Sequence, residues 1–192
     1  MGYYRAGFED ITGIDIKPMP RYPFKFIQAD ALEYLVAHGA EYDVIHASPP
    51  CQAYSQARRL QGNREHPDFI APTRVLLEQT GKPWIIENVV GAPIRVDLLL
   101  CGSMFGLGII RHRIFESNIP MPLLVPTCHH ENVYDPWHGN GRTADKFREA
   151  MGIDWMPIGG GSHKQGSIDE AIPPAYTEFI GKQILMKVGS AS

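Results

Sequence analysis

Residues 42–55 read YDVIHASPPCQAYS and join a short apolar run to a stiff loop that carries a cysteine. The run YDVIHA (42–47) is nearly continuous in apolar residues, which is typical of a strand buried on both faces of a parallel sheet. Pro49 and Pro50 each fix their own φ, and the residue before a proline is forced out of the helical region. We therefore expect Cys51 to be held in a fixed place at the carboxyl end of the strand.

Two more apolar runs of the same kind lie at ITGIDI (11–16) and PWIIENV (83–89). Each of the three runs ends near a residue that can do chemistry: Asp15, Cys51 and Glu87. Helical apolar spacing marks the segments that separate or follow the strands, namely residues 31–38, 68–80, 144–153 and 173–188. Strands that alternate with helices predict a doubly wound α/β sheet, which binds its ligands at the carboxyl ends of its strands.

Length and composition limit the possible classes of protein. The 192 residues suit one domain with at most a small insert, and a formal net charge of −3 gives no general attraction to nucleic acid. No apolar stretch approaches membrane-spanning length and the N-terminus lacks a signal-peptide layout, so we expect a soluble, cytoplasmic protein without a membrane partner. The three cysteines form no CxxC pair, which predicts free thiols.

Each candidate residue has a chemical interpretation and a structural one. Cys51 can be a nucleophile if a nearby cation or dipole lowers its pKa, or it can be a buried structural thiol. Glu87 ends an apolar strand, where a carboxylate is either functional or paired with an arginine. Arg111 and Arg113 alternate, so in a strand they would share one face, either beside a ligand or in solvent. A thiol-dependent hydrolase would need a histidine base near Cys51, and His46 lies close in sequence.

Three segments carry a resemblance to a known family. SPPCQAYS (48–55) resembles the Pro-Cys catalytic loop of DNA (cytosine-5) methyltransferases, ENV (87–89) resembles their glutamate motif, and RHR (111–113) resembles their Arg-x-Arg motif. The three follow one another in the family's order. REAMGIDWM (148–156) and EAIPPAYTEFIGKQI (170–184) are similar to later segments of the family. The resemblance covers nearly the whole chain and is greatest to small members of phage type, which act in the bacterial cytoplasm.

The resemblance implies a Rossmann-like methyltransferase sheet and a reaction. A methyl group from S-adenosylmethionine would be transferred to C5 of a cytosine flipped out of double-stranded DNA. Because C5 is a poor nucleophile, the thiolate of Cys51 would first add to C6 and make C5 electron-rich. Glu87 would stabilise the resulting charge through N3 and the exocyclic amine, and Arg113, with Arg111 beside it, would hold the base oxygen.

The resemblance also implies which residues hold the cofactor and the DNA. Asp15 would bind the ribose hydroxyls and Asp30 the adenine amine, although Asp30 can equally be a helix cap. Ile16 and Ala31 would lie beside these carboxylates, and Pro50 would line the methyl-donor side of the crevice. The loop that follows would contact DNA through a set of polar and basic side chains: Gln52, Tyr54, Ser55, Arg58 and Arg59.

The family pattern divides the chain into a catalytic and cofactor-binding core (1–116), a short, irregular target-recognition insert (117–142) and a C-terminal segment that returns to the core (143–192). Four residues of the insert could supply zinc ligands: Cys128, His129, His130 and His138. Their spacing matches no common zinc pattern, so we expect no metal and favour contacts with DNA or turn caps. Cys101 is predicted to be a core residue.

One family segment is expected to be missing. These enzymes open with a strand and a Phe-x-Gly-x-Gly loop for the methionine end of the cofactor, whereas this chain opens at MGYYRAGF (1–8), which would follow that loop. We therefore expect the first strand to be absent, or to come from an earlier start or a second chain. The alternative function is that of a truncated, non-catalytic protein of methyltransferase fold that binds DNA or a partner chain.

Overall fold

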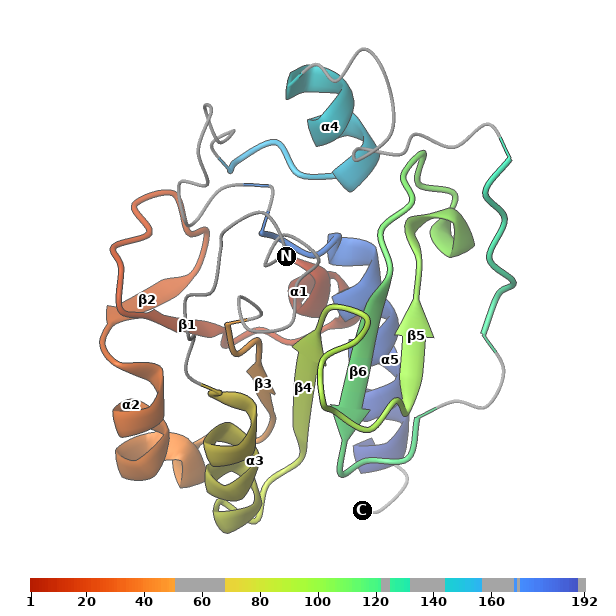
Figure 1. Cartoon of the computed structure of the whole chain (residues 1–192). Coiled ribbons are helices and arrows are strands. Elements are labelled where there is room, and N and C mark those ends of the chain that lie inside the picture. The colour runs from red at the N-terminus through yellow and green to blue at the C-terminus, as the bar shows by residue number, and fades with distance from the viewer. Residues whose placement is uncertain (51–67, 122–124, 132–143, 157–167, 169, 190–192) are drawn as a thin grey trace. The chain divides into compact units, whose positions relative to one another are not determined.

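The structure, a computed structural model, describes residues 1–50, 68–121, 125–131, 144–156, 168 and 170–189 (Figure 1). The chain forms two compact units. The first unit contains residues 1–28, 100–111 and 122–192, and the second contains residues 29–99 and 112–121. Each unit has its own hydrophobic cluster of buried side chains.

The second unit is built on a four-stranded sheet with the order β3-β4-β6-β5. Its strands are β3 (Ile45–Ala47), β4 (Trp84–Asn88), β5 (Leu98–Leu100) and β6 (Arg113–Ser117). β3 pairs with β4 in parallel and β4 pairs with β6 antiparallel, so the sheet is mixed rather than wholly parallel. The strands predicted within 42–47 and 83–89 are confirmed, whereas β6 was not predicted, because residues 113–117 form no continuous apolar run.

The helical segments of this unit are α2 (Ala31–His38), η1 (Gly39–Glu41) and α3 (Ile70–Gln79). Asp30 caps α2 as predicted, because its Oδ1 accepts hydrogen bonds from the backbone N–H groups of Leu32 (2.9 Å) and Glu33 (3.1 Å). Gly81, with a φ of 67°, follows α3 in the left-handed conformation that commonly closes a helix. The two helices predicted before and after β3 are thus confirmed.

The core of the second unit lies between α3 and one face of the sheet. Side chains alternate along a strand, and Trp84 and Ile86 of β4 point to this face together with Ile114 of β6. Ile70 and Leu77 of α3 belong to the same buried cluster. The side chains that alternate with these along β4 and β6 therefore belong to the opposite face of the sheet.

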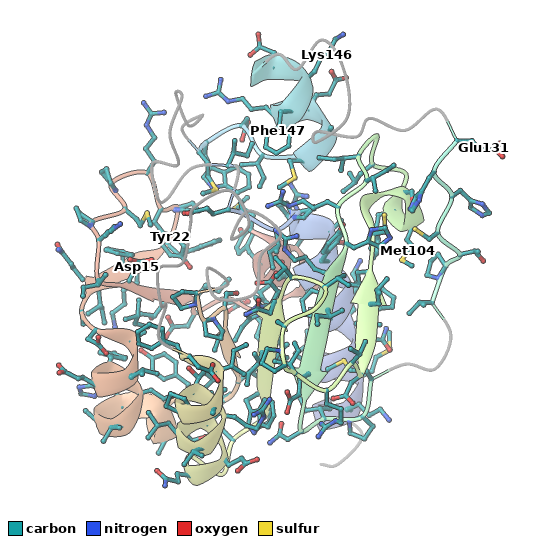
Figure 2. The ribbon with its side chains drawn as sticks, viewed as in Figure 1. Asp15, Tyr22, Met104, Glu131, Lys146 and Phe147 are labelled. Carbon is teal, nitrogen blue, oxygen red and sulfur yellow. The ribbon has the colours of Figure 1, made fainter. Side chains whose placement is uncertain are left out.

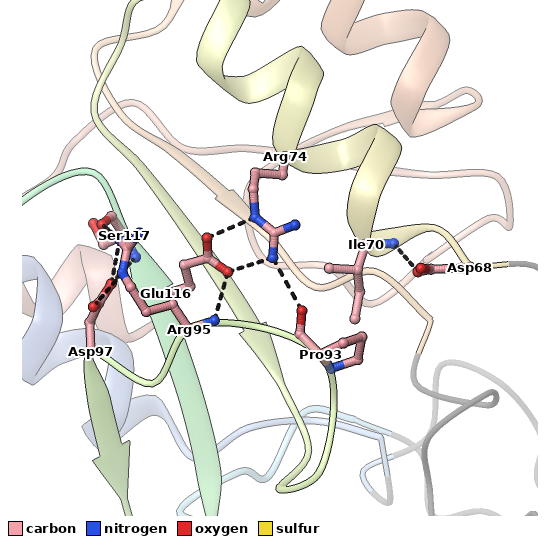
Figure 3. Close-up of polar contacts among 8 residues, drawn as sticks. All are labelled: Asp68, Ile70, Arg74, Pro93, Arg95, Asp97, Glu116 and Ser117. Carbon is pink, nitrogen blue, oxygen red and sulfur yellow. Dashed lines mark hydrogen bonds and ion pairs between the residues drawn. The ribbon is translucent and has the colours of Figure 1, made fainter.

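A buried carboxylate ties α3 to the sheet (Figure 3). Glu116 of β6 accepts hydrogen bonds from Nε and Nη2 of Arg74, both at 2.7 Å, and from the backbone N–H of Arg95 at 3.1 Å. Arg95 also pairs with both oxygens of Asp97, and Oδ2 of Asp97 accepts a hydrogen bond from the backbone N–H of Ser117 at 2.9 Å. Paired planar groups of this kind are both strong and directional, so the network fixes α3 and the β4–β5 loop against β6.

The first unit holds the two ends of the described chain. Its elements are α1 (Gly2–Ala6), β1 (Thr12–Asp15), β2 (Lys25–Gln28), η3 (Gly102–Phe105), α4 (Ala144–Met151) and α5 (Pro174–Gly189). β1 and β2 are parallel and form a sheet of two strands. The predicted helices within 144–153 and 173–188 are confirmed, and the second of the two prolines opens α5.

Close packing of α1 on α5 depends on two glycines (Figure 1). A methyl group on Gly2 would collide with the hydroxyl of Thr177. A methyl group on Gly181 would lie 2.7 Å from Cβ of Ala6, which is closer than two carbon atoms normally approach. Any side chain at either position would therefore push the two helices apart.

Within the part of the chain that the structure describes, the strands form one sheet of two strands and one of four, and the prediction of a single doubly wound sheet is not confirmed. The predicted α/β class is confirmed, because α2 lies between β2 and β3 and α3 lies between β3 and β4. Among the helices of the described ranges, none combines the length and the hydropathy that crossing a membrane requires.

Candidate active site

Glu87 and Arg113 form a buried ion pair in the second unit. The antiparallel ladder places Glu87 of β4 opposite Phe115 of β6, and Arg113 lies two residues before Phe115 on the same face. Nε of Arg113 is 2.8 Å from Oε1 of Glu87, whose residue is only 7% exposed. The structure thus brings together two predicted site residues, and Arg113 does not lie on a solvated face. The alternative prediction for Glu87, an ion pair with an arginine, is the contact observed.

Asn88 connects this pair to the segment that precedes Cys51. Its Nδ2 donates a hydrogen bond to the carbonyl oxygen of Pro49 at 3.0 Å, and its Oδ1 accepts one from the backbone N–H of Val89 at 2.9 Å. Pro49 is buried and Pro50 is exposed. Since β3 and β4 are parallel neighbours, their carboxyl ends lie at one edge of the sheet, and Asn88 tethers the loop there. Asn88 was not among the predicted site residues, although its place in the ENV motif was a usable signal.

His46 lies on β3, on the same face of the sheet as Glu87. Its backbone pairs with Ile85, and its ring packs edge-on against the ring of Phe115 with centroids 6.4 Å apart. Burial lowers the pKa of His46 to about 4, so the imidazole is neutral at neutral pH. A histidine with so low a pKa is a weak base, which disfavours the hydrolase interpretation.

Arg111 belongs to the first unit and is buried. Its carbonyl oxygen accepts a hydrogen bond from the hydroxyl of Tyr176 on α5. Because β6 begins only at Arg113, the alternation of the two arginines is not a strand alternation, which corrects the geometric reason for grouping them. The predicted solvated face is also wrong for Arg111.

The first unit places two of the predicted cofactor residues at the end of β1 (Figure 2). Oδ1 of Asp15 accepts the backbone N–H of Lys17 at 2.8 Å, which fixes the carboxylate at the strand end. Ile16 follows with 64% of its surface exposed. The ring of Tyr22 covers Gly13 in the same strand, since a methyl group there would lie 2.6 Å from Cζ. The carboxylate of Asp15 can accept hydrogen bonds from ribose hydroxyls, and the exposed side chain of Ile16 can pack against a flat base.

The other cofactor candidates lie in the second unit. Both capping hydrogen bonds of Asp30 go to Oδ1, and within the described residues Oδ2 accepts none. The capping role is therefore real and still leaves one oxygen for a ligand amine. Ala31, the first residue of α2, and Pro50 are both exposed.

Several predicted site residues lie outside the described residues. They are Cys51, the five predicted DNA contacts Gln52, Tyr54, Ser55, Arg58 and Arg59, and His138. The predicted insert is described at 117–121 and 125–131. Cys101 is buried, as predicted, and its sulfur contacts the polar side chains of Ser103 and His130.

Comparisons with known proteins add no assignment. No protein-family model matches the chain, and a search of curated proteins found no match. The site must therefore be interpreted from its own geometry.

Proposed function

We propose that this chain is a DNA (cytosine-5) methyltransferase that uses S-adenosylmethionine. The observation that carries the proposal is the arrangement at one edge of the second unit's sheet. There the buried Glu87–Arg113 pair lies next to the end of β4 and at the start of β6, and Asn88 hydrogen-bonds to Pro49, two residues before Cys51. Two of the segments that resemble the family, 48–55 and 87–89, are thus joined by a hydrogen bond, and the third, 111–113, supplies the arginine that pairs with Glu87.

In the proposed reaction the thiolate of Cys51 places negative charge on the base, and Glu87 stabilises that charge. The thiolate of Cys51 forms a bond to C6, and the electron pair of the C5–C6 double bond moves toward C5. Glu87 accepts a hydrogen bond from the exocyclic amine and shares a proton with N3, which spreads the charge over the ring. After C5 has gained its methyl group, solvent water takes the proton from C5, the electron pair of that C–H bond re-forms the C5–C6 double bond, and the C6–S bond breaks to release the thiolate of Cys51. Arg113 is a positioning residue that holds the carboxylate of Glu87.

The cofactor supplies the electrophilic methyl group. Asp15 and Ile16 would hold its ribose, and Asp30, through Oδ2, and Ala31 its adenine. The exposed ring of Pro50 would line the methyl-donor side. Both carboxylates fit these roles, because in Asp15 and in Asp30 the hydrogen bonds from nearby backbone N–H groups go to Oδ1, which leaves Oδ2 for a ligand.

A second candidate is a protein of methyltransferase fold that binds DNA or a partner chain without catalysis. One observation favours it: the described strands form two sheets, whereas a doubly wound fold needs one continuous sheet to build its ligand crevice. A second chain or a further segment that supplied a strand would restore the enzyme.

A covalent trap separates the two candidates. The chain is incubated with S-adenosylmethionine and duplex DNA that contains 5-fluorocytosine, in which fluorine cannot leave C5 as a proton does. The enzyme should form a protein–DNA adduct that survives denaturing electrophoresis, and Glu87→Gln should abolish it. Glu178→Gln, which breaks an exposed ion pair with Lys182, should keep it. Absence of the adduct from folded protein, or its formation by Cys51→Ser, contradicts the proposal.

A further inference from the structure

Two thiols and an imidazole converge in the first unit. Cys101 directly follows β5 and precedes η3, whereas Cys128 and His130 lie in the segment 125–131. Nε2 of His130 is 3.6 Å from Sγ of Cys101 and 2.6 Å from Sγ of Cys128. The potential ligand atoms of these three residues all lie within 4.8 Å of one another.

Ser103 of η3 lies beside both sulfur atoms. Its hydroxyl donates to Sγ of Cys101 at 3.4 Å, lies 3.5 Å from Sγ of Cys128 and accepts the backbone N–H of His129 at 3.3 Å. Hydrogen bonds from a neighbouring hydroxyl orient sulfur ligands and offset their negative charge. Ser103 therefore provides the outer support that metal sites commonly have.

Hydrophobic packing does not account for this convergence. Cys101 is fully buried, but Cys128 is only partly buried and His130 is exposed. The described residues 125–131 form no helix or strand, so side-chain contacts must fix this segment to η3. In Figure 2, Glu131 marks the end of the segment and Met104 marks η3.

The separations suit a tetrahedral zinc ion. Zinc binds thiolates at about 2.3 Å and imidazole nitrogens at about 2.0–2.1 Å, so sulfur and nitrogen ligands of one ion lie about 3.6 Å apart. The Cys101–His130 separation of 3.6 Å already has this value. The Cys128–His130 separation must open by about 1 Å, which is a small side-chain movement on an irregular segment. Soft sulfur ligands combined with imidazole select zinc over hard cations such as magnesium or calcium.

We propose that Cys101, Cys128 and His130 bind a structural zinc ion that fixes the segment 125–131 to η3. These three residues leave one position of a tetrahedral ion for water or a further ligand. The expectation that no metal binds here came from the spacing of Cys128 and the histidines alone, because it did not include Cys101. The zinc site is independent of the proposed methyl transfer.

The test is the zinc content of the full chain and of single variants. The protein is purified without chelators, supplied with zinc, dialysed and measured by inductively coupled plasma mass spectrometry. The expected result is one zinc ion per chain, as in structural sites of this type. Cys128→Ser and His130→Ala should reduce the zinc content to background, and both change residues that are not fully buried. His129→Ala is the matched control, since the neighbouring imidazole is not in the cluster, and it should keep the ion.

A cobalt substitution identifies the ligands directly. Cobalt in the proposed site should show a thiolate charge-transfer band and the intense visible bands of tetrahedral geometry, both lost in Cys128→Ser. Three results would overturn the proposal: no zinc bound by the folded wild-type chain, full retention of zinc by Cys128→Ser and His130→Ala, or a Cys101–Cys128 disulfide in protein kept under reducing conditions. None of these readouts depends on methyl transfer, so failure of the zinc site and failure of the proposed function are distinguishable.

Discussion

Replacing Glu116 by Gln should destabilise the second unit strongly without touching the proposed active site. Glu116 and Glu87 are both buried carboxylates paired with arginine, but they occupy opposite faces of the sheet, because Glu116 pairs with Ile86 and Glu87 with Phe115. Glu116 therefore has a structural role, and its loss should be measured in unfolding and not in chemistry.

The magnitude follows from the contacts of Glu116. Its carboxylate accepts two short hydrogen bonds from Arg74 and one from the backbone of Arg95. Removing one partner of a buried ion pair typically costs about 3–5 kcal/mol. The Arg74 side chain is 27% exposed and can regain some hydration, so we expect the lower end, about 3 kcal/mol. In a chain of this size that corresponds to a decrease in Tm of about 6–12 °C.

The assay is thermal unfolding followed by circular dichroism, with Glu178→Gln as the matched control. The Glu178–Lys182 pair is as short, at 2.6 Å, but it lies on a helix surface one turn apart. Its loss should cost about 0.3–0.5 kcal/mol and change Tm by no more than about 2 °C. Equal changes in Tm for the two variants, or a Glu116→Gln protein as stable as wild type, would refute the reasoning from burial.

Three further predictions concern packing, pH and the loop tether. Gly181→Ala should lower stability by about 1–3 kcal/mol in urea unfolding, because the new methyl group overpacks against Ala6. Burial lowers the pKa of His46 to about 4, whereas in the unfolded chain the imidazole binds a proton below about pH 6.5. The free energy of unfolding should therefore keep its full His46 contribution above pH 6.5 and fall by up to about 3 kcal/mol as the pH is lowered to 4. Asn88→Asp removes the donor to the Pro49 carbonyl and should slow methyl transfer about tenfold or more, measured as kcat.

A control variant or a decisive measurement accompanies each of the three predictions. Gly108→Ala adds a methyl group in open space and should be nearly neutral, so an equal loss there would contradict the packing argument. His46→Gln should remove its share of the acid sensitivity, and an unchanged pH profile would show that other groups cause it. Wild-type kcat in Asn88→Asp would mean that the tether does not position the loop.

Local signals predicted much of the fold. Asp30 followed by an apolar helical pattern predicted the start of α2, and the proline pair predicted the start of α5. Short apolar runs that alternate with helices predicted parallel strands, and β3 and β4 are parallel, so their carboxyl ends lie at one edge of the sheet. These features depend on residues close in sequence, where capping and periodicity act directly.

Long-range pairing could not be predicted in the same way. The strand β6 enters the sheet antiparallel between β4 and β5, and the Arg74–Glu116 contact joins residues 42 positions apart. The division into two sheets and the convergence of Cys101 with His130 have the same origin, because a contact between distant segments leaves no spacing pattern in the sequence. Glu87 was recognised as unusual from its apolar surroundings, but its partner Arg113 was identified through the RHR motif.

The central claim is that this chain methylates cytosine through Cys51. The most direct measurement is nucleoside mass spectrometry of genomic DNA from a methylation-deficient host that expresses the chain. The account predicts 5-methylcytosine with the wild-type chain and none with an equally soluble, folded Cys51→Ser protein. Absence of 5-methylcytosine with folded wild-type protein, or its persistence in Cys51→Ser, would contradict the claim.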